Sequence, residues 1–279
     1  MIAPSQAGVA TPGARSGGGS ESSGISATAA EESFAAGKGP ISRRPRRNRI
    51  RPLDAFRALR ALARSGGTDY AQAAAFMKAT EGRSGQRTFA RFLASECGAR
   101  LSRRRPSLRD TLDQDRGALA ILPSGTLGRA YHDFMAANAF SLEALAELGR
   151  AGHQRPMQGD EEWFTDRMNA LHDLRHVIVG YGREALGELC LVAYRFAEVG
   201  HPGMAFFAVA WGLKLVREQR GQPVVAAIME AYRRGRDSVW MDDLDWEAML
   251  SRPVTEIRAM LNLAPPSVYD RITTSRSAA

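Results

Sequence analysis

Apolar side chains recur every three or four residues along most of this 279-residue chain, from Pro52 to the C-terminal region. That spacing places them on one face of an α-helix, whereas a strand with one buried face shows strict alternation. No segment sustains such alternation between turn dipeptides of the hairpin type. Glycines and prolines divide the periodic part into short units. The sequence therefore predicts an all-α fold, with a single helical-bundle domain.

Helices are predicted between these breaks. In the N-terminal half the expected helices are 52–65, 69–78, one through Phe89, Phe92 and Leu93, 107–122, one from Leu127 with Thr126 as its cap, and one from Ser141 to Gly152. In the C-terminal half they are 161–179, 183–199, 203–218, 223–235, 243–250, and a last one opening at Arg252–Pro253. The basic stretch from Arg100 to Pro106 is expected to be an irregular surface connection.

The first 48 residues differ in composition from the rest of the chain. Residues 1–40 hold eight glycines, seven serines and almost no large apolar side chains, too few to offset the entropy lost on folding. We therefore expect a disordered tail over 1–48, a helical domain over 49–270 and a flexible C-terminus over 271–279. The arginine-rich run from Ser42 to Arg51 has three interpretations: a solvated linker, a contact with anionic lipid, or a nucleic-acid arm.

The net charge of +8 is concentrated in the tail. Residues 1–52 carry eight lysines and arginines against three glutamates, which gives +5 and leaves +3 for the other 227 residues. An excess of basic residues that lies mainly in a tail does not indicate a nucleic-acid-binding domain. No nucleic acid is therefore expected as a partner. Cys97 and Cys190 lie in apolar helical patterns, which excludes a disulfide scaffold and fits a reducing compartment.

Hydropathy excludes an integral membrane protein. The mean hydropathy is -0.29, and 24% of the residues are charged. The longest uninterrupted apolar stretch, around Met204 to Leu213, has about half the length that spans a bilayer. No apolar segment follows a charged start, so no secretory signal peptide is expected. Any membrane association is therefore expected to be peripheral.

Two histidines four residues apart form the most informative chemical pattern. His172 and His176 lie roughly 40° apart around one helix and one turn along it, a spacing that offers two imidazoles to one cation. Asp173, about 100° from His172, can orient a ligand, take a proton from metal-bound water, or join the ligands directly. Two nitrogens with one or two carboxylates suit zinc, iron or manganese better than calcium.

A further ligand candidate, Glu188, requires a turn in the backbone. On one straight helix it would lie about 18 Å beyond His176, too far to share an ion. Gly180 and Gly182 lie between them and allow the chain to leave one helix and begin another. If the helix ran straight through, Glu188 would be excluded from this site.

Other interpretations remain open from the residues alone. The two histidines can be ordinary surface residues, with Glu188 paired to Arg195. A zinc protease helix requires Glu directly after the first histidine, where this chain has Asp173. A His–Asp phosphohydrolase requires one more histidine on an earlier helix and a late aspartate, for which the candidates are His132, His153 and Asp237.

The same residues resemble a known signature. His172 to His176 is followed after eleven residues by Glu188, with Gly180–Tyr181–Gly182 between them and Leu186–Gly187–Glu188–Leu189 around the glutamate. This pattern closely resembles the signature of the Coq-four family of coenzyme Q (ubiquinone) biosynthesis proteins. Residues 122–128, followed by Tyr131 and Phe134, are similar to the family's central motif. Residues 245–247, followed by 252–254, Ile257 and Arg258, are similar to its C-terminal motif. The resemblance covers roughly residues 50–268.

The resemblance implies an activity and a site. It implies a divalent metal, usually taken as Zn2+, held by the residues that are also the expected catalytic ones: His172, Asp173, His176 and Glu188. The implied reaction is oxidative decarboxylation, which removes the ring C1 carboxyl of a polyprenylated hydroxybenzoate with hydroxylation at that carbon. The alternative is a non-catalytic, lipid-binding scaffold that organises the ubiquinone biosynthetic enzymes.

The resemblance also implies partners and a location. The partners are the polyprenylated benzoate or quinone precursor, other ubiquinone biosynthesis enzymes and a membrane surface, and a homodimer is compatible with the sequence. The expected location is cytoplasmic, peripheral on the inner membrane or the equivalent face in an organelle. A prenyl tail needs an apolar groove, and a helix stripe that offers one, although it also fits plain core, is Phe206, Phe207, Trp211 and Leu215.

Overall fold

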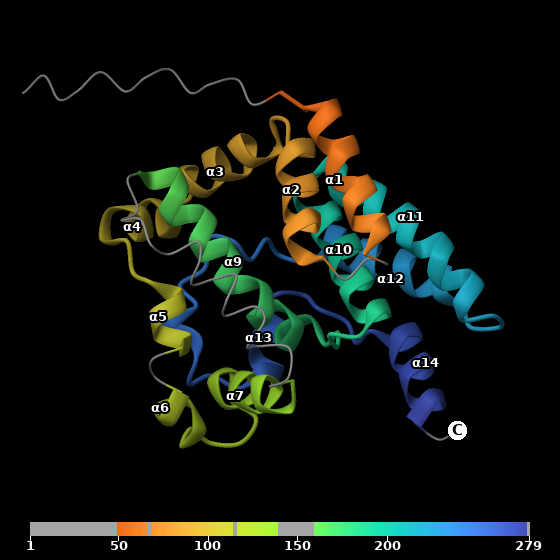
Figure 1. The fold of residues 1–279 in the computed structure, drawn as a ribbon. Coiled ribbons are helices and arrows are strands. Elements are labelled where there is room, and N and C mark those ends of the chain that lie inside the picture. The colour runs from red at the N-terminus through yellow and green to blue at the C-terminus, as the bar shows by residue number, and fades with distance from the viewer. Residues whose placement is uncertain (1–48, 66–68, 114–115, 139–158, 278–279) are drawn as a thin grey trace, which may run out of the picture. The chain divides into compact units, whose positions relative to one another are not determined.

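The computed structural model describes residues 49–65, 69–113, 116–138 and 159–277 of the chain (Figure 1). These residues form α-helices joined by short connections, with one 3-10 helix and no strand among them. The prediction of an all-α fold is confirmed for this part of the chain. The predicted disordered tail over 1–48 and the predicted helix from Ser141 to Gly152 lie outside the described residues.

The helices follow one another closely along the sequence. Those before residue 139 are α1 (Pro52–Arg64), α2 (Tyr70–Thr80), α3 (Ser84–Ala94), α4 (Glu96–Arg104), α5 (Leu108–Asp113), α6 (Arg116–Ala120) and α7 (Leu127–Ala137). Those after residue 158 are α9 (Asp160–Val179), α10 (Ala185–Val199), α11 (Pro202–Glu218), α12 (Val224–Asp237), η1 (Glu247–Met249), α13 (Val254–Met260) and α14 (Ser267–Ser277). None of these helices is both long and apolar enough to cross a membrane.

Helix α10 lies at the centre of the packing. It contacts α3, α9, α11 and α12, and most of its residues from Leu186 to Arg195 are buried. Helix α12 approaches it closely at Gly235, where an added Cβ would lie 2.3 Å from the carbonyl oxygen of Tyr194. A side chain at this position would force the two helices apart, so the close packing requires glycine. The main apolar cluster continues from α10 and α12 into α7, α9 and α13.

A second group of helices, the α1–α2–α11 layer, packs around α2. Helix α2 contacts both α1 and α11 (Figure 1). Ala55 and Ala58 of α1 share an apolar cluster with Phe76 of α2 and Phe207 of α11. The rings of Phe76 and Phe207 lie 5.2 Å apart in an edge-to-face arrangement, which suits aromatic quadrupoles. This layer forms one side of the cavity described below.

One segment predicted to be irregular is a helix. The prediction of a connection from Arg100 to Pro106 is wrong, because α4 continues to Arg104. Ser95 caps this helix by accepting a hydrogen bond from the amide of Gly98 at 2.9 Å, and Leu101 is buried. The arginines lie in the last turn, where positive charge stabilises the helix carbonyls. The basic run therefore belongs to a helix C-terminus.

Other boundaries also differ from the predictions. The helix predicted over 107–122 coincides with α5 and α6, and residues 114–115 between them lie outside the described residues. Most of 243–250 is not helical, because only η1 forms there. Thr126 precedes α7, but its hydroxyl donates to the carbonyl of Pro123 and makes no cap bond to the helix. Helix α14 extends to Ser277 where a flexible end from residue 271 was expected, and the buried Ile272 joins it to the core.

Candidate metal centre

The chain reverses direction directly after α9. Gly180 has a φ of 82°, a left-handed conformation that favours glycine, and its amide donates to the carbonyl of His176 at 2.9 Å. Helix α10 is then capped by the carboxylate of Glu184, which accepts from the amide of Gly187 at 3.0 Å. The turn predicted from the glycines is therefore present, and it returns Glu188 towards the end of α9.

Two arginines from the C-terminal helices hold the last turn of α9. Arg258 donates to the carbonyl of Ile178 at 2.8 Å and to that of Val177 at 2.9 Å. Arg234 donates to the carbonyl of Val179 at 2.8 Å. The last carbonyls of a helix have no partner within it, and they carry partial negative charge that guanidinium groups neutralise. The position of His176, one turn before this end, is fixed by these contacts.

Four side chains converge at the turn. His172, Asp173 and His176 each place a potential ligand atom within 4.8 Å of the others. Oε2 of Glu188 lies 3.6 Å from Nε2 of His172 and 3.4 Å from Nε2 of His176. His176 is buried, Asp173 is mostly buried, and the side chains of His172 and Glu188 are partly exposed. The structure thus brings together all four residues that the sequence pattern singled out.

This arrangement fits a divalent cation. Ligand atoms about 2.0 to 2.2 Å from one ion at tetrahedral angles lie about 3.3 to 3.6 Å from each other. The two distances from the glutamate to the imidazoles, 3.4 and 3.6 Å, fall in that range. Nε2 of His176 and Oδ1 of Asp173 are buried and have no hydrogen-bond partner. Because buried polar atoms without a partner are costly, a cation bound here would stabilise both.

A backbone carbonyl determines which nitrogen His176 presents. Nδ1 of His176 lies 3.0 Å from the carbonyl oxygen of Tyr181. A carbonyl can only accept, so Nδ1 carries the proton and Nε2 keeps its lone pair. Phe134 of α7 stacks on the same imidazole, with ring centroids 5.7 Å apart. The ring is therefore oriented with its free lone pair towards Glu188, as in histidines that bind metals.

The charge state of Glu188 also suits a ligand. Burial raises the pKa of its carboxyl, but the adjacent imidazoles of His172 and His176, when protonated, outweigh burial and hold that pKa below its usual range. The carboxyl group is therefore ionised at neutral pH. Only the deprotonated form of a carboxyl binds a metal well, so no proton has to be displaced from Glu188.

Arg183 is a site residue that the sequence pattern did not reveal. Its Nη1 lies 3.5 Å from Oδ1 of Asp173, and its Nε lies 4.0 Å from Oε1 of Glu188. Only 10% of this side chain is exposed. A guanidinium between two carboxylates stabilises their ionised forms and restricts their orientations. The one available signal was its place in the short connection between Gly180 and Glu184, where it is the single basic residue.

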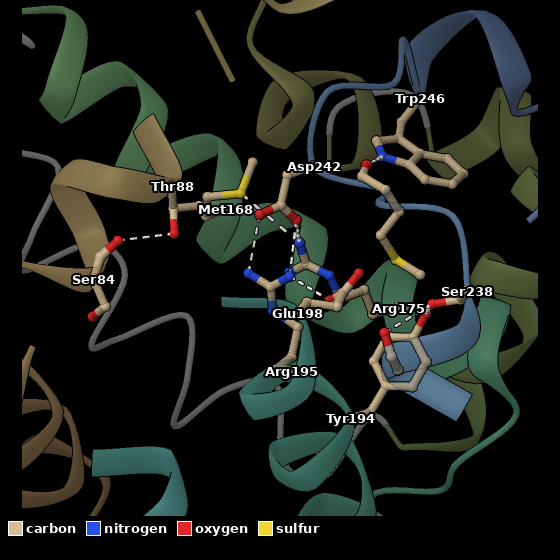
Figure 2. Close-up of polar contacts among 12 residues, drawn as sticks. Ser84, Thr88, Met168, Arg175, Tyr194, Arg195, Glu198, Ser238, Asp242 and Trp246 are labelled. Carbon is tan, nitrogen blue, oxygen red and sulfur yellow. Dashed lines mark hydrogen bonds and ion pairs between the residues drawn. The ribbon is translucent and has the colours of Figure 1, made fainter. Parts of the chain in front are cut away.

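A buried ion network joins α9 to α10 (Figure 2). Arg175, next to His176 in the sequence, pairs with Asp242. Arg195 of α10 donates to the two oxygens of Asp242 at 3.0 and 3.1 Å and also pairs with Glu198. Burial raises the pKa of Asp242, but the two arginines outweigh burial and keep it below its ordinary value. The network fixes the register between the helices that carry the site residues.

A cavity of about 700 Å³ lies beside His172. Its walls come from α2, α3, α9, α10 and α11, and its apolar lining includes Met77, Phe89, Met168 and Phe207. Of the four residues expected to form an apolar groove, Phe207 alone lines this cavity, while Leu215 is buried in the core and Phe206 is exposed. A wider hollow of about 1030 Å³ between α12 and α13 contains none of the site residues.

The structure weakens the other interpretations of the histidines. Arg195 contacts Asp242 and Glu198 instead of Glu188, and His176 is not a surface residue. Within the described ranges, the single group of three or more potential metal ligands is that of His172, Asp173 and His176. The phosphohydrolase candidates lie elsewhere: His132 pairs with Asp133, Asp237 pairs with Arg236, and His153 is outside the described residues.

Comparison with known proteins identifies the family. The sequence model of a family described as coenzyme Q (ubiquinone) biosynthesis protein Coq4 matches residues 53–267. The chain belongs to the Coq4 family. The matched range includes every residue of the candidate metal centre. Membership makes this chain a relative of proteins of ubiquinone biosynthesis and confirms the resemblance carried by the signature.

The similar proteins are distant in sequence but agree in family and fold. The chain is 28% identical over 173 residues to the rat "Ubiquinone biosynthesis protein COQ4 homolog, mitochondrial". This alignment covers 61% of the chain and 62% of the relative. It is 26% identical over 187 residues to "Ubiquinone biosynthesis protein COQ4, mitochondrial" of Vanderwaltozyma polyspora. That alignment covers 67% of the chain and 53% of the relative. The chain thus spans about half to three fifths of the length of these relatives. A crystal structure from Nostoc punctiforme shares the fold, with a TM-score of 0.57, 20% identity, and coverage of 75% of this chain and 97% of that one.

Proposed function

We propose that this Coq4-family protein is a metal-dependent enzyme that removes the ring C1 carboxyl of a polyprenylated hydroxybenzoate at the membrane surface. A hydroxyl group would enter at the same carbon. The main support is that two imidazoles and two carboxylates meet in one cluster. One of the imidazoles, that of His172, lines a cavity that also has apolar side chains. The substrate has the same division, with a charged ring at one end and a long hydrocarbon chain at the other.

The reaction is a two-electron oxidation. The carboxyl carbon leaves as carbon dioxide, and the oxygen of the new hydroxyl takes its place on the ring. We propose dioxygen as the co-substrate that accepts the two electrons. With water as the source of the hydroxyl oxygen, dioxygen takes up the two electrons and two protons and leaves as hydrogen peroxide. The other ubiquinone biosynthesis enzymes would supply the prenylated acid and consume the hydroxylated product.

The four site residues would hold a divalent cation, for which we propose Zn2+ from the mixed nitrogen and oxygen donors. When bound, the cation supplies positive charge that binds the ring carboxylate or phenolate and stabilises negative charge on the ring. His176 offers Nε2 because Tyr181 occupies its other nitrogen. Asp173, held by Arg183, would be a further ligand or a carboxylate that orients the ligands.

Removal of a ligand tests this proposal. We expect protein purified without chelator to contain zinc, and to convert a prenylated hydroxybenzoate with a short, soluble chain. His172→Ala and Glu188→Ala should each lower the bound metal and reduce turnover by about a hundredfold or more, because a site that loses a ligand holds the ion and substrate poorly. Metal content, product formation and far-ultraviolet circular dichroism are the measurements.

The matched control is His132→Ala, which removes an imidazole from α7 outside the site. It should retain metal and turnover. If the purified protein contains iron or manganese instead of zinc, the proposed metal is wrong but the four proposed ligands are unaffected. Full turnover in folded His172→Ala and Glu188→Ala would contradict the enzyme proposal.

The same cavity supports the second candidate, a non-catalytic scaffold that binds a prenylated lipid and gathers the biosynthetic enzymes. A lipid chain can occupy the apolar lining without any reaction at His172. In that case the wild-type protein would bind the short-chain substrate without product formation, and His172→Ala would alter the retention of partner enzymes or lipid instead. The turnover assay distinguishes the two functions.

A further inference from the structure

The outer side of α11 carries a continuous row of exposed apolar residues. They follow one another at intervals of three and four residues, so they share one helix face: Phe206, Val209, Leu213 and Val216. Val209 and Leu213, in the middle of the row, are 65% and 54% exposed. The opposite side of α11 is also apolar, since Leu215 is buried in the core. A helix at the surface of a water-soluble domain normally has a polar outer face.

Exposed apolar side chains are concentrated in this part of the molecule. Six of the thirteen large apolar residues that are exposed in the described ranges lie on α1 and α11. Those on α1 are Leu53 and Phe56, at 72% and 62% exposure. The two helices are joined through α2, where the ring of Phe76 lies 5.2 Å from that of Phe206. Scattered apolar residues are normal on a surface, but a continuous row on one helix face, as on α11, marks an interaction site.

Positive charge accompanies the apolar row. Exposed basic residues on or directly after these two helices outnumber acidic ones by six to two: Arg57, Arg60, Arg64, Lys214, Arg217 and Arg220 against Asp54 and Glu218. The combination of an apolar row with basic residues is typical of a helix that lies in the interface of an anionic bilayer. There the apolar side chains enter the acyl boundary and the basic side chains meet the headgroups.

We propose that the outer face of α11, together with the exposed side of α1, is the surface by which this protein binds an anionic lipid bilayer. Charge complementarity supports lipid over a second copy of the chain as the occupant. Two identical faces brought together would place the arginines of α1 and α11 against one another, and like charges at an interface oppose association.

Docking by α11 would bring the cavity to the bilayer. Met204 and Phe207 line the cavity from α11, and Ala74 and Met77 line it from α2. A prenyl chain inside the cavity would extend from the wall formed by these two helices towards His172. This route rests on the proposed function, whereas the binding of lipid by α11 does not.

Sedimentation with vesicles tests the surface directly. The full chain is mixed with vesicles of phosphatidylcholine alone, or of phosphatidylcholine with phosphatidylglycerol. We expect binding to the anionic vesicles that weakens as salt is added. The double variant Val209→Glu/Leu213→Glu should bind about tenfold or more weakly, because two apolar side chains leave the interface and two negative charges are repelled. Arg217→Ser/Arg220→Ser should reduce binding to anionic vesicles by up to about fivefold per residue.

The matched control is Ile121→Glu, which introduces the same charge at an 84% exposed apolar position after α6. It should bind vesicles like the wild type. The proposal is overturned if the wild type binds neither vesicle, if the α11 double variant binds as the wild type does, or if Ile121→Glu causes the same loss. It is also overturned if light scattering shows a wild-type dimer that the double variant converts to a monomer with unchanged vesicle binding, because the face would then join two copies.

The outcome is separable from that of the proposed reaction. Val209 and Leu213 lie outside the cavity lining, so the double variant should convert a soluble short-chain substrate at the wild-type rate without lipid. Lost vesicle binding with intact turnover supports the docking surface. Intact vesicle binding in a protein without turnover would leave this surface standing and remove the enzyme proposal alone.

Discussion

The α9–α10 pair and the α1–α2–α11 layer depart from the usual arrangement of polar and apolar residues in opposite directions. Between α9 and α10, Arg175, Asp242 and His176 are buried. On α11, Val209 and Leu213 are exposed to solvent. A buried polar group needs a partner, and an exposed apolar group needs a cover. The comparison teaches that each departure marks a proposed binding region: a cation site among the buried charged groups, and a lipid-binding face on the exposed side of α11.

The largest expected effect tests whether the buried charges hold the α9–α10 pair together. Asp242→Ala leaves two guanidinium groups, those of Arg175 and Arg195, without their shared carboxylate in the interior (Figure 2). Breaking a buried ion pair from one side costs about 3 to 5 kcal/mol. We expect a fall of that size in the free energy of unfolding, measured by urea denaturation.

The control for this variant is Asp237→Ala, which breaks an exposed pair with Arg236 at the end of α12. Exposed ion pairs contribute little, so the urea midpoint should stay at the wild-type value. Equal midpoints for the two variants would show that the interior of the α9–α10 pair gains no stability from its charges, and the comparison between the two regions would fail.

The next effect concerns the cation. A ligand that binds the folded state alone, at a thousand times its Kd, stabilises that state by about 4 kcal/mol. We expect zinc to raise the thermal midpoint of the wild type and a chelator to reverse this rise. The double variant His176→Ala/Glu188→Ala should respond to neither addition, while His132→Ala should respond as the wild type does. A wild-type midpoint that zinc leaves unchanged would count against the metal site.

The parts of the fold that follow from local rules were accessible from sequence. Periodic apolar residues and glycine stops locate α9, α10, α11 and α12 to within a few residues, and Gly180 marks the turn that brings Glu188 to the histidines. The basic end of α4 was misread because an arginine run suits both a loop and the last turn of a helix. The cap at Ser95 was the local signal that favoured the helix.

The contacts that complete the site were not accessible in this way. Arg175 and Arg195 meet Asp242 from positions 67 and 47 residues away, and no local pattern specifies such pairs. Arg183 reaches Asp173 only because the chain folds back at Gly180. Sequence periodicity indicates which helix face is apolar, but the three-dimensional packing decides which of those faces stays exposed, as on α11.

A smaller effect tests the role of Arg183. Arg183→Ala removes the guanidinium that lies between Asp173 and Glu188, so the carboxylates lose a partner that orients them. Changes beside metal ligands typically cost about 10- to 100-fold in activity or metal affinity. We expect kcat/KM to fall within that range while most of the zinc is retained, and Arg183→Lys to recover part of the loss.

The matched control is Arg109→Ala. Arg109 lies on α5 and pairs at 3.0 Å with Asp166 of α9, the helix that also carries Asp173. Arg109 lies outside the site, so the kcat/KM of the variant should equal that of the wild type. If Arg183→Ala and Arg109→Ala have the same kinetics, Arg183 has no positioning role.

The smallest effect lies in the α1–α2–α11 layer and concerns the start of α11. His201 caps this helix, because its Nδ1 accepts a hydrogen bond from the amide of Gly203 at 3.0 Å. Burial lowers the pKa of His201 below its ordinary value of 6.5; the carboxylate of Glu81 acts in the opposite direction, and Arg195 adds to the lowering. Protonation would also remove the lone pair that forms the cap.

The sign of the pH dependence follows from this lowered pKa. Below pH 6.5 the unfolded chain binds a proton at His201 that the folded chain resists, so stability falls as the pH drops towards the folded-state pKa. His201→Asn keeps a capping side chain without a titratable group, and should flatten the fall in thermal midpoint between about pH 7 and pH 5. Hydrogen exchange at acidic pH should show that α11 amides lose protection before α10 amides, because the cap belongs to α11 alone. Equal loss of protection in both helices would mean that the two regions open as one unit.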